Sequence, residues 1–231
     1  MKVPAGRGSE GVSGLQIIAI VNQKGGVGKT SLAMNLAWFL HTAGGHTVVL
    51  DADPQRSATR WAAAQNGSWG VEVRSVDAER DIALVSRDLE GIASETGAEF
   101  VVFDCPPELR NATEVALLLA DVSLIPVTPS PLDIWAAEAA VTLASDVQRV
   151  RGDGRPEVAL VPNRLIRNTV MARELPSALE ALGKTVAPGI SERIVVAESA
   201  ILGQTVPEYS PKSPAYAEFL ALARFVMERL K

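Results

Sequence analysis

The chain has 231 residues, of which 47% are hydrophobic and 21% are charged, with a formal net charge of −5; this length and composition are typical of one soluble globular domain. No apolar run reaches the roughly 18 residues that a membrane-spanning helix requires, and no basic start followed by a long apolar stretch indicates an export signal. The single cysteine, Cys105, excludes an intramolecular disulfide and a four-cysteine cluster within one chain. We therefore expect a cytoplasmic protein.

Apolar runs and helical patterns alternate from residue 15 onward, after a glycine-rich segment, 1–14, that we expect to be a flexible leader. The predicted strands are Leu15–Asn22, Thr47–Leu50, Val71–Val76, Phe100–Phe103, Val122–Val127, Glu157–Val161 and Thr185–Pro188. The predicted helices are Ser31–Ala43, Ser57–Gln65, Ile82–Glu95, Ala112–Ala120, Pro131–Val150, Arg173–Leu182, Ala197–Leu202 and Pro214–Leu230. This alternation predicts a single domain over residues 15–231 with a three-layer α/β fold, in which helices cover both faces of a mostly parallel sheet.

The loop of residues 24–30, between the first predicted strand and helix, reads KGGVGKT. A strand, a glycine-rich turn and a helix N-terminus form a phosphate cradle, because backbone N–H groups and the positive end of the helix dipole face the anion. Lys29 can reach terminal phosphates, and the Thr30 hydroxyl can ligate Mg²⁺. The usual loop has a glycine at the position of Gln23, whereas here a second lysine, Lys24, begins the loop. A second fixed cation exceeds what a monomeric nucleotide site requires.

Acidic residues follow two other predicted strands, at the edge where parallel sheets bind ligands. Asp51 and Asp53 follow the second strand, and Asp104 follows the fourth. We expect Asp104 to hold Mg²⁺ through water, because Mg²⁺ keeps most of its waters and takes one or two carboxylates. Asp51 and Asp53 point differently, so one could face the metal and the other an attacking water. Asp133, near the start of a predicted helix, is expected to cap that helix instead.

These motifs together resemble those of the ParA/MinD family of ATPases with a deviant phosphate loop. The matching segments are the loop 24–30, DADPQ at 51–55 and FDCPP at 103–107, and the resemblance covers nearly all of residues 15–231 in motif order and spacing. The missing first loop glycine is usual in that family. The resemblance implies the P-loop nucleoside triphosphatase fold, with ATP and Mg²⁺ as cofactors.

The resemblance also implies roles for individual residues. ATP would be sandwiched in a homodimer, where Lys24 reaches the partner's phosphates, Lys29 binds the β- and γ-phosphates and Asp53 positions the attacking water; these three would be the catalytic residues. The Mg²⁺ site would comprise Thr30, Asp51 and Asp104. The residues expected to bind ATP are Lys24, Gly25, Gly26, Val27, Gly28, Lys29, Thr30, Ser31 and, by its resemblance to a base-contacting position, Asn163.

Within the family, the sequence best resembles the short ParA type. The last predicted helix carries few basic residues, so we expect it to pack on the body of the protein rather than to anchor it to a membrane. The resemblance then implies a slow ATPase stimulated by a small adaptor protein. As an ATP dimer it would bind non-specific DNA and position a plasmid, a chromosome region or a compartment such as a carboxysome over the nucleoid. The alternatives are a MinD-like membrane-surface ATPase and an ATP-dependent ligase of the dethiobiotin synthetase type.

The charge distribution supplies the candidates for DNA contact. Residues 1–148 hold 10 basic and 18 acidic residues, whereas residues 149–231 hold 12 basic and 9 acidic residues. A basic C-terminal part suits a face that meets polyanions, although a solvated mixed surface would give the same counts. The candidates are Arg151, Arg164, Arg167, Arg173, Arg193, Lys212 and Arg224.

Overall fold

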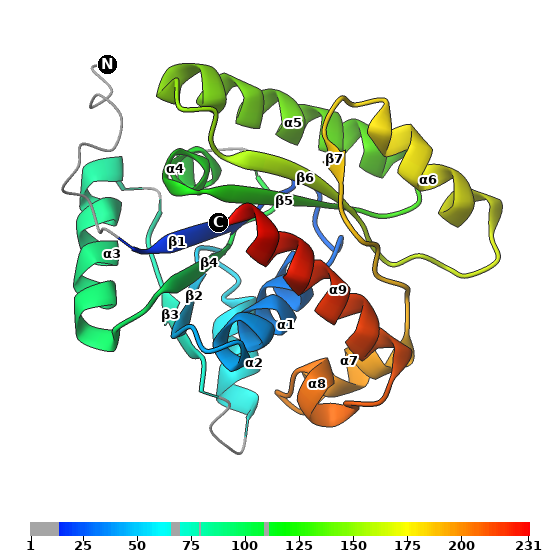
Figure 1. Cartoon of the computed structure of the whole chain (residues 1–231), viewed down its shortest axis with the longest axis horizontal. Coiled ribbons are helices and arrows are strands. Elements are labelled where there is room, and N and C mark those ends of the chain that lie inside the picture. The colour runs from blue at the N-terminus through cyan, green and yellow to red at the C-terminus, as the bar shows by residue number, and fades with distance from the viewer. Residues whose placement is uncertain (1–13, 66–69, 79, 109–110) are drawn as a thin grey trace.

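The chain forms one seven-stranded sheet in which all paired strands are parallel, as the alternation predicts (Figure 1). The computed structural model describes residues 14–65, 70–78, 80–108 and 111–231, so the leader expected at 1–14 lies almost wholly outside the described residues. The strands are ordered β3-β2-β4-β1-β5-β6-β7, which places β1 between β4 and β5. The fold is that of the P-loop nucleoside triphosphatases.

The elements follow the predicted order. The strands are β1 (Gln16–Ile20), β2 (Thr47–Asp51), β3 (Glu72–Ser75), β4 (Phe100–Asp104), β5 (Val122–Val127), β6 (Glu157–Pro162) and β7 (Thr185–Val186). The helices are α1 (Lys29–Thr42), α2 (Ser57–Ala64), α3 (Ile82–Thr96), α4 (Asn111–Leu119), α5 (Pro131–Arg151), α6 (Val170–Glu180), α7 (Ile194–Ile201), α8 (Val206–Tyr209) and α9 (Pro214–Arg229).

Several boundaries and one helix differ from the prediction: β1, β7 and α6 each end two residues earlier than expected. Helices α1, α6 and α7 begin two or three residues earlier than expected. The short helix α8 was missed, although Thr205 and Glu208 form a capping box there and Pro207 lies in its first turn. The earlier start of α1 matters most, because it makes Gly28 the N-cap and brings Lys29 into the first helical turn.

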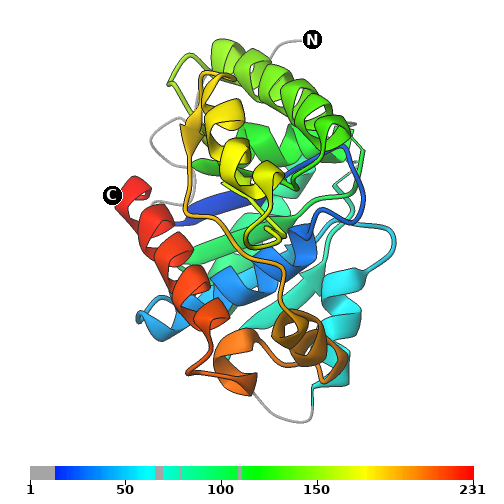
Figure 2. The same cartoon turned by 90° about the vertical axis from the view of Figure 1, so that its right-hand side faces the viewer.

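Alternating side chains of each buried strand enter two separate cores. In β1, Ile17 and Ala19 pack with α3, α4 and α5, whereas Ile18 and Ile20 pack with α1, α2 and α9. Figures 1 and 2 show the same division, with α5 lying over one face of the sheet and α1 and α9 over the other. Helices on both faces explain why the central strands are nearly continuous apolar runs.

Helix α9 uses its apolar face inside the protein, as expected. Phe219, Leu222, Ala223 and Val226 are buried in the core that contains α1. Its N-terminus is capped by Ser213, whose hydroxyl accepts a hydrogen bond from the Tyr216 backbone N–H. None of the described helices is both long enough and apolar enough to cross a bilayer.

Candidate functional site

The phosphate loop joins the end of β1 to the start of α1, at the carboxyl edge of the sheet. Gly28 has φ of 90°, and a side chain there would also come within 2.5 Å of the Asn163 amide nitrogen, so this position requires glycine on two grounds. Gly28, the N-cap residue of α1, has no side chain to cap the helix, and no other cap is found among the described residues. The first-turn N–H groups are therefore available, with the helix dipole, to bind an anion.

Lys29 lies deep in this site. It is 7% exposed, and its Nζ donates hydrogen bonds to the backbone oxygens of Asn22, at 3.2 Å, and Lys24, at 3.1 Å. Burial lowers the pKa of Lys29, and the nearby Asp104 carboxylate opposes that shift. The loop itself thus holds the ammonium group in position.

Lys24, the extra lysine, points to a different neighbour. Its ammonium group forms an ion pair with Asp133, and the Thr128 hydroxyl donates to the other oxygen of that carboxylate. The Lys24 side chain is 41% exposed, whereas that of Asp133 is 4% exposed. The expectation that Asp133 caps its helix is wrong: Ser130 is the N-cap of α5, and Asp133 lies inside the first turn, where it contacts the phosphate loop.

The adjacent strand β4 supplies a group suited to a metal ion. Asp104, which is 1% exposed, accepts a 2.7 Å hydrogen bond from the Thr30 hydroxyl through Oδ2, while Oδ1 is buried and has no partner among the described residues. Burial raises the pKa of Asp104 to about 7, with Thr30 and Lys29 opposing the shift and Asp51 adding to it. A partnerless carboxylate oxygen beside a hydroxyl is an oxygen donor set that suits Mg²⁺.

Asp51 and Asp53, which follow β2, occupy different environments. Asp51 is 1% exposed and its carboxylate is turned toward α2, where it accepts hydrogen bonds from the Thr59 backbone N–H and hydroxyl, both at 2.8 Å. Asp53 is half-buried and lines two neighbouring cavities, of about 520 and 720 Å³. Asp53 therefore faces open space where a reacting group or water can sit, whereas Asp51 is engaged within the fold.

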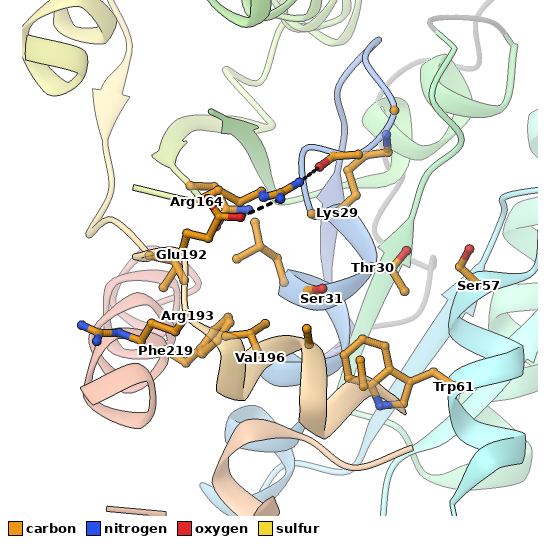
Figure 3. Close-up of a pocket in the computed structure, with 18 of the residues that line it drawn as sticks. Lys29, Thr30, Ser31, Ser57, Trp61, Arg164, Glu192, Arg193, Val196 and Phe219 are labelled. Carbon is orange, nitrogen blue, oxygen red and sulfur yellow. Dashed lines mark hydrogen bonds and ion pairs between the residues drawn. The ribbon is translucent and has the colours of Figure 1, made fainter. Parts of the chain in front are cut away.

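The first cavity runs along the phosphate loop and continues between α1 and α7 (Figure 3). Thr30 and Ser31 lie at its centre, Arg164 and Glu192 at one end, and Trp61 at the other. A volume of about 520 Å³ is in the range of small-molecule sites. Loop residues that line it include Gly25, Gly26, Gly28 and Lys29.

Asn163 and Arg164, at the end of β6, close the cavity from the side of the sheet. Asn163 is 4% exposed and donates a 2.6 Å hydrogen bond to the Val27 backbone oxygen. Arg164 donates to the Gly26 backbone oxygen at 3.1 Å and pairs with Glu192 at 2.8 Å. Both residues therefore brace the phosphate loop.

Three of the seven expected DNA-contacting residues serve other purposes. The expectation for Arg151 is wrong, because its side chain is 8% exposed and its guanidinium donates to the backbone oxygens of Leu117, Leu118 and Ala120 at the end of α4. Arg164 braces the phosphate loop, and Arg193 lines the first cavity and pairs with Glu218 at 2.8 Å. The exposed candidates that remain are Arg167, Arg173, Lys212 and Arg224.

Comparison with known proteins agrees with this geometry. Residues 15–85 match the model of the family described as "AAA domain". The chain is 29% identical to the maintenance of carboxysome distribution protein A of Halothiobacillus neapolitanus over 87% of this chain and 91% of that protein, and 33% identical to its Gloeobacter kilaueensis counterpart over 72% and 68%. It is 29% identical to the chromosome-partitioning ATPase Soj of Thermus thermophilus, over 93% and 96%.

Among solved structures, the cell division protein MinD of Aquifex aeolicus superposes with a TM-score of 0.77, at 20% identity, over 92% of this chain and 97% of that one. The parallel sheet, the glycine-rich loop at a helix N-terminus and the buried aspartate of β4 define a P-loop ATPase that binds a nucleotide with Mg²⁺. The chain belongs to the ParA/MinD family of ATPases.

Proposed function

We propose that this protein is an ATP-operated positioning switch of the ParA type. As an ATP-bound homodimer it binds DNA without sequence preference and positions or segregates a cargo over the nucleoid. The observation that carries the proposal is the second lysine, Lys24, which is half-exposed, pairs with Asp133 and is not among the residues that line the cavity along its own phosphate loop. The relatives whose names refer to chromosome partitioning and to carboxysome distribution support the cargo-positioning role.

Different residues around the phosphate loop would bind the phosphates of ATP and the Mg²⁺ ion. The first-turn N–H groups of α1 and the Lys29 ammonium bind the terminal phosphates, because the N–H groups are fixed by the helix and the ammonium is held in place by two backbone oxygens. Thr30 and Asp104 hold Mg²⁺, directly or through its waters. When bound, Mg²⁺ neutralises charge that develops on the phosphates. A solved structure of a related protein, an Asp-to-Ala variant of McdA, contains ATP.

Asp53 is the group that orients the attacking water. It lies on the loop between β2 and α2 and faces both cavities, within the space next to the phosphate loop. A carboxylate at that place can accept a proton from water and align it for attack. Hydrolysis is slow without a partner, and a small adaptor protein accelerates it, as the resemblance to the short ParA type implies.

Lys24 acts on the nucleotide of the other subunit. In the single chain its charge is satisfied by Asp133, so crossing to a partner requires that this ion pair open. The phosphates of a triphosphate bound in the facing subunit supply a stronger anion, which compensates for the loss of the carboxylate. The dimer therefore forms when both sites hold ATP, and hydrolysis removes the bridging phosphate.

Exposed basic residues provide the DNA contacts. Arg167, Arg173, Lys212 and Arg224 are exposed and have no ion-pair partner within the described part of the chain. Contacts between such side chains and phosphates carry no sequence information and weaken steeply as salt rises. Dimerisation doubles their number on one particle, which raises the effective affinity for a long polyanion.

A membrane-surface role of the MinD type is less well supported. The apolar side chains of α9 are committed to the core with α1, so the helix has no free apolar face to insert into lipid. A ligase of the dethiobiotin synthetase type also shares the phosphate loop, but such an enzyme has no use for a second lysine outside its own cavity.

A gel shift with duplex DNA of arbitrary sequence tests the proposal. We expect retardation with ATP and Mg²⁺, weak retardation with ADP, and none by the Lys29→Ala variant under any condition. Equal DNA binding with ATP, with ADP and without nucleotide would contradict the switch. Pelleting with vesicles in ATP, with no DNA retardation, would favour the membrane alternative.

A further inference from the structure

The most informative contact network outside the phosphate loop surrounds Asp51. This residue ends β2 and is 1% exposed. Its Oδ2 accepts hydrogen bonds from the backbone N–H and the hydroxyl of Thr59, both at 2.8 Å, and its Oδ1 accepts one from the Asp53 backbone N–H at 3.3 Å. Asp51 thus joins the two ends of the loop that carries Asp53.

The N-terminus of α2 explains why a carboxylate is needed there. Its N-cap residue, Arg56, has φ of 51° and provides no side-chain cap. Thr59 is the third helical residue, whose N–H a cap residue would normally satisfy. Asp51 satisfies it instead, from a strand eight residues earlier in the chain, and its negative charge also favours the positive end of the helix dipole.

The same network continues into the neighbouring strand. Because the Thr59 hydroxyl donates its proton to Asp51, the Ser75 hydroxyl at the end of β3 donates to the Thr59 oxygen, at 3.1 Å. The backbone oxygen of Asp51 accepts a further hydrogen bond from the Val76 N–H at 3.0 Å. Through its carboxylate and its backbone oxygen, Asp51 therefore ties together the ends of two strands and the start of a helix.

Asp104, on the adjacent strand, has the opposite pattern of contacts. The two aspartates are register partners in β2 and β4, yet Asp104 keeps one buried oxygen without a partner among the described residues, while both oxygens of Asp51 are engaged. A ligand to Mg²⁺ or to its waters needs a free lone pair directed at the ion. Asp104 meets that requirement with an oxygen that has no partner among the described residues, whereas Asp51 already accepts three hydrogen bonds, two from Thr59 in α2 and one from the Asp53 backbone N–H.

We propose that Asp51 is a positioning residue, which anchors α2 through Thr59 and thereby fixes the loop that presents Asp53, rather than a metal ligand. The inference rests on the proposed function, because it gives Asp53 the task of orienting the attacking water. The anchor acts on the rate of hydrolysis and leaves the binding of ATP and Mg²⁺ to the phosphate loop, Thr30 and Asp104.

The test compares Thr59→Val with Thr59→Ser. Valine keeps the branched shape and the backbone N–H but removes the hydroxyl donor, whereas serine restores that donor. We expect Thr59→Val to lower the single-turnover rate of ATP hydrolysis about tenfold, since small misplacements of a catalytic group have effects of that order or larger, and Thr59→Ser to restore it to within about twofold. The affinity for a fluorescent ATP analogue and the Mg²⁺ concentration for half-maximal rate should stay unchanged in both.

Thr42→Val is the matched control, because it removes a hydroxyl that bonds only to backbone oxygens within α1. Asp51→Asn distinguishes an anchor from a metal ligand: we expect a reduced rate at every Mg²⁺ concentration with an unchanged half-saturation point. Wild-type rates in Thr59→Val, or a rate in Asp51→Asn that excess Mg²⁺ restores, would overturn the inference while leaving the proposed function intact. A wild-type protein that binds ATP without hydrolysing it would instead contradict the proposed function.

Discussion

The two lysines of the phosphate loop have opposite surroundings. Lys29 is buried and held by backbone oxygens of its own loop, whereas Lys24 is half-exposed and held by one carboxylate from a distant helix. Backbone carbonyls stay in place for as long as the fold persists, but a half-exposed ion pair contributes little and exchanges partners readily. The loop therefore carries one fixed cation and one that can be released.

The rest of the site divides in the same way. We call Lys29, Thr30 and Asp104 the buried half, because Lys29 and Asp104 are buried and the half-buried Thr30 donates its hydroxyl proton to Asp104. We call Lys24, Asp53 and Arg56 the exposed half, because these residues face a cavity or the solvent. The buried half is suited to holding nucleotide in one chain, and the exposed half to sensing a second chain or a water molecule.

The largest expected effect comes from removing the buried cation. Lys29→Ala should weaken ATP binding about 100-fold, because charge-assisted hydrogen bonds to phosphate contribute about 1.5–3 kcal/mol each. Titration with a fluorescent ATP analogue measures it. Lys212→Ala, which removes an exposed lysine elsewhere, is the control and should bind ATP as the wild type does. If Lys29→Ala bound the ATP analogue as tightly as the wild type, Lys29 would not be the fixed cation that holds the nucleotide.

The next effect concerns the buried carboxylate and pH. Because the pKa of Asp104 is raised to about 7, the folded nucleotide-free protein keeps this proton between about pH 4 and pH 7, where the unfolded chain has lost it, so stability falls across this range and levels off above pH 7. Asp104→Asn has no such proton to lose, so the wild type should lose about 2.7 kcal/mol of stability relative to this variant between pH 5 and pH 8. Urea denaturation without Mg²⁺ at both pH values tests this. If the free energies of unfolding of the wild type and Asp104→Asn changed equally between pH 5 and pH 8, Asp104 would already be ionised at pH 5.

A smaller effect is expected for the partner of the exposed cation. Asp133→Asn keeps an oxygen for the Thr128 hydroxyl but releases Lys24, whose ion pair is worth about 1 kcal/mol at such exposure. The ATP concentration for half-maximal dimerisation should fall about fivefold, a ratio that corresponds to this energy. Analytical ultracentrifugation across an ATP series is the measurement. Weaker dimerisation by Asp133→Asn would mean that the carboxylate orients Lys24 for its partner rather than restraining it.

The smallest effect concerns the backbone of the exposed half. Arg56 adopts a left-handed conformation with φ of 51°, which glycine adopts without the steric penalty of a side chain. Arg56→Gly should raise the free energy of unfolding by about 0.5–1 kcal/mol. Thermal denaturation compares it with Arg60→Gly, which lies inside α2 and should be destabilised by about 1 kcal/mol. If both glycine variants were less stable than the wild type, contacts of the Arg56 side chain would stabilise the fold by more than its left-handed conformation destabilises it.

The sequence predicted the order of the elements and the phosphate loop, because both depend on contiguous patterns. Strand runs, turn glycines and the aspartates that end β2 and β4 are all visible within a few residues. The order of the strands in the sheet, with β4 next to β1, is not, since it depends on which apolar faces pack together.

The errors have the same origin. Asp133 was expected to be a helix cap because its partner, Lys24, lies 109 residues away. Arg151 was counted as a surface charge, although its guanidinium satisfies carbonyls of α4 that sequence spacing does not connect with it. The role of Thr59 was not predicted because a single threonine on a short helix forms no recognisable motif. In each case a tertiary contact determines the role of the side chain, and neither composition nor hydrophobic periodicity predicts that contact.

The proposal depends above all on Lys24 acting across a dimer. Size-exclusion chromatography with light scattering, performed with Mg²⁺ and a non-hydrolysable ATP analogue, tests this directly in the wild type and in Lys24→Ala. The account predicts that both proteins bind the analogue, that the wild type becomes a dimer, and that Lys24→Ala remains a monomer. A Lys24→Ala protein that dimerises at the same analogue concentration as the wild type would contradict it.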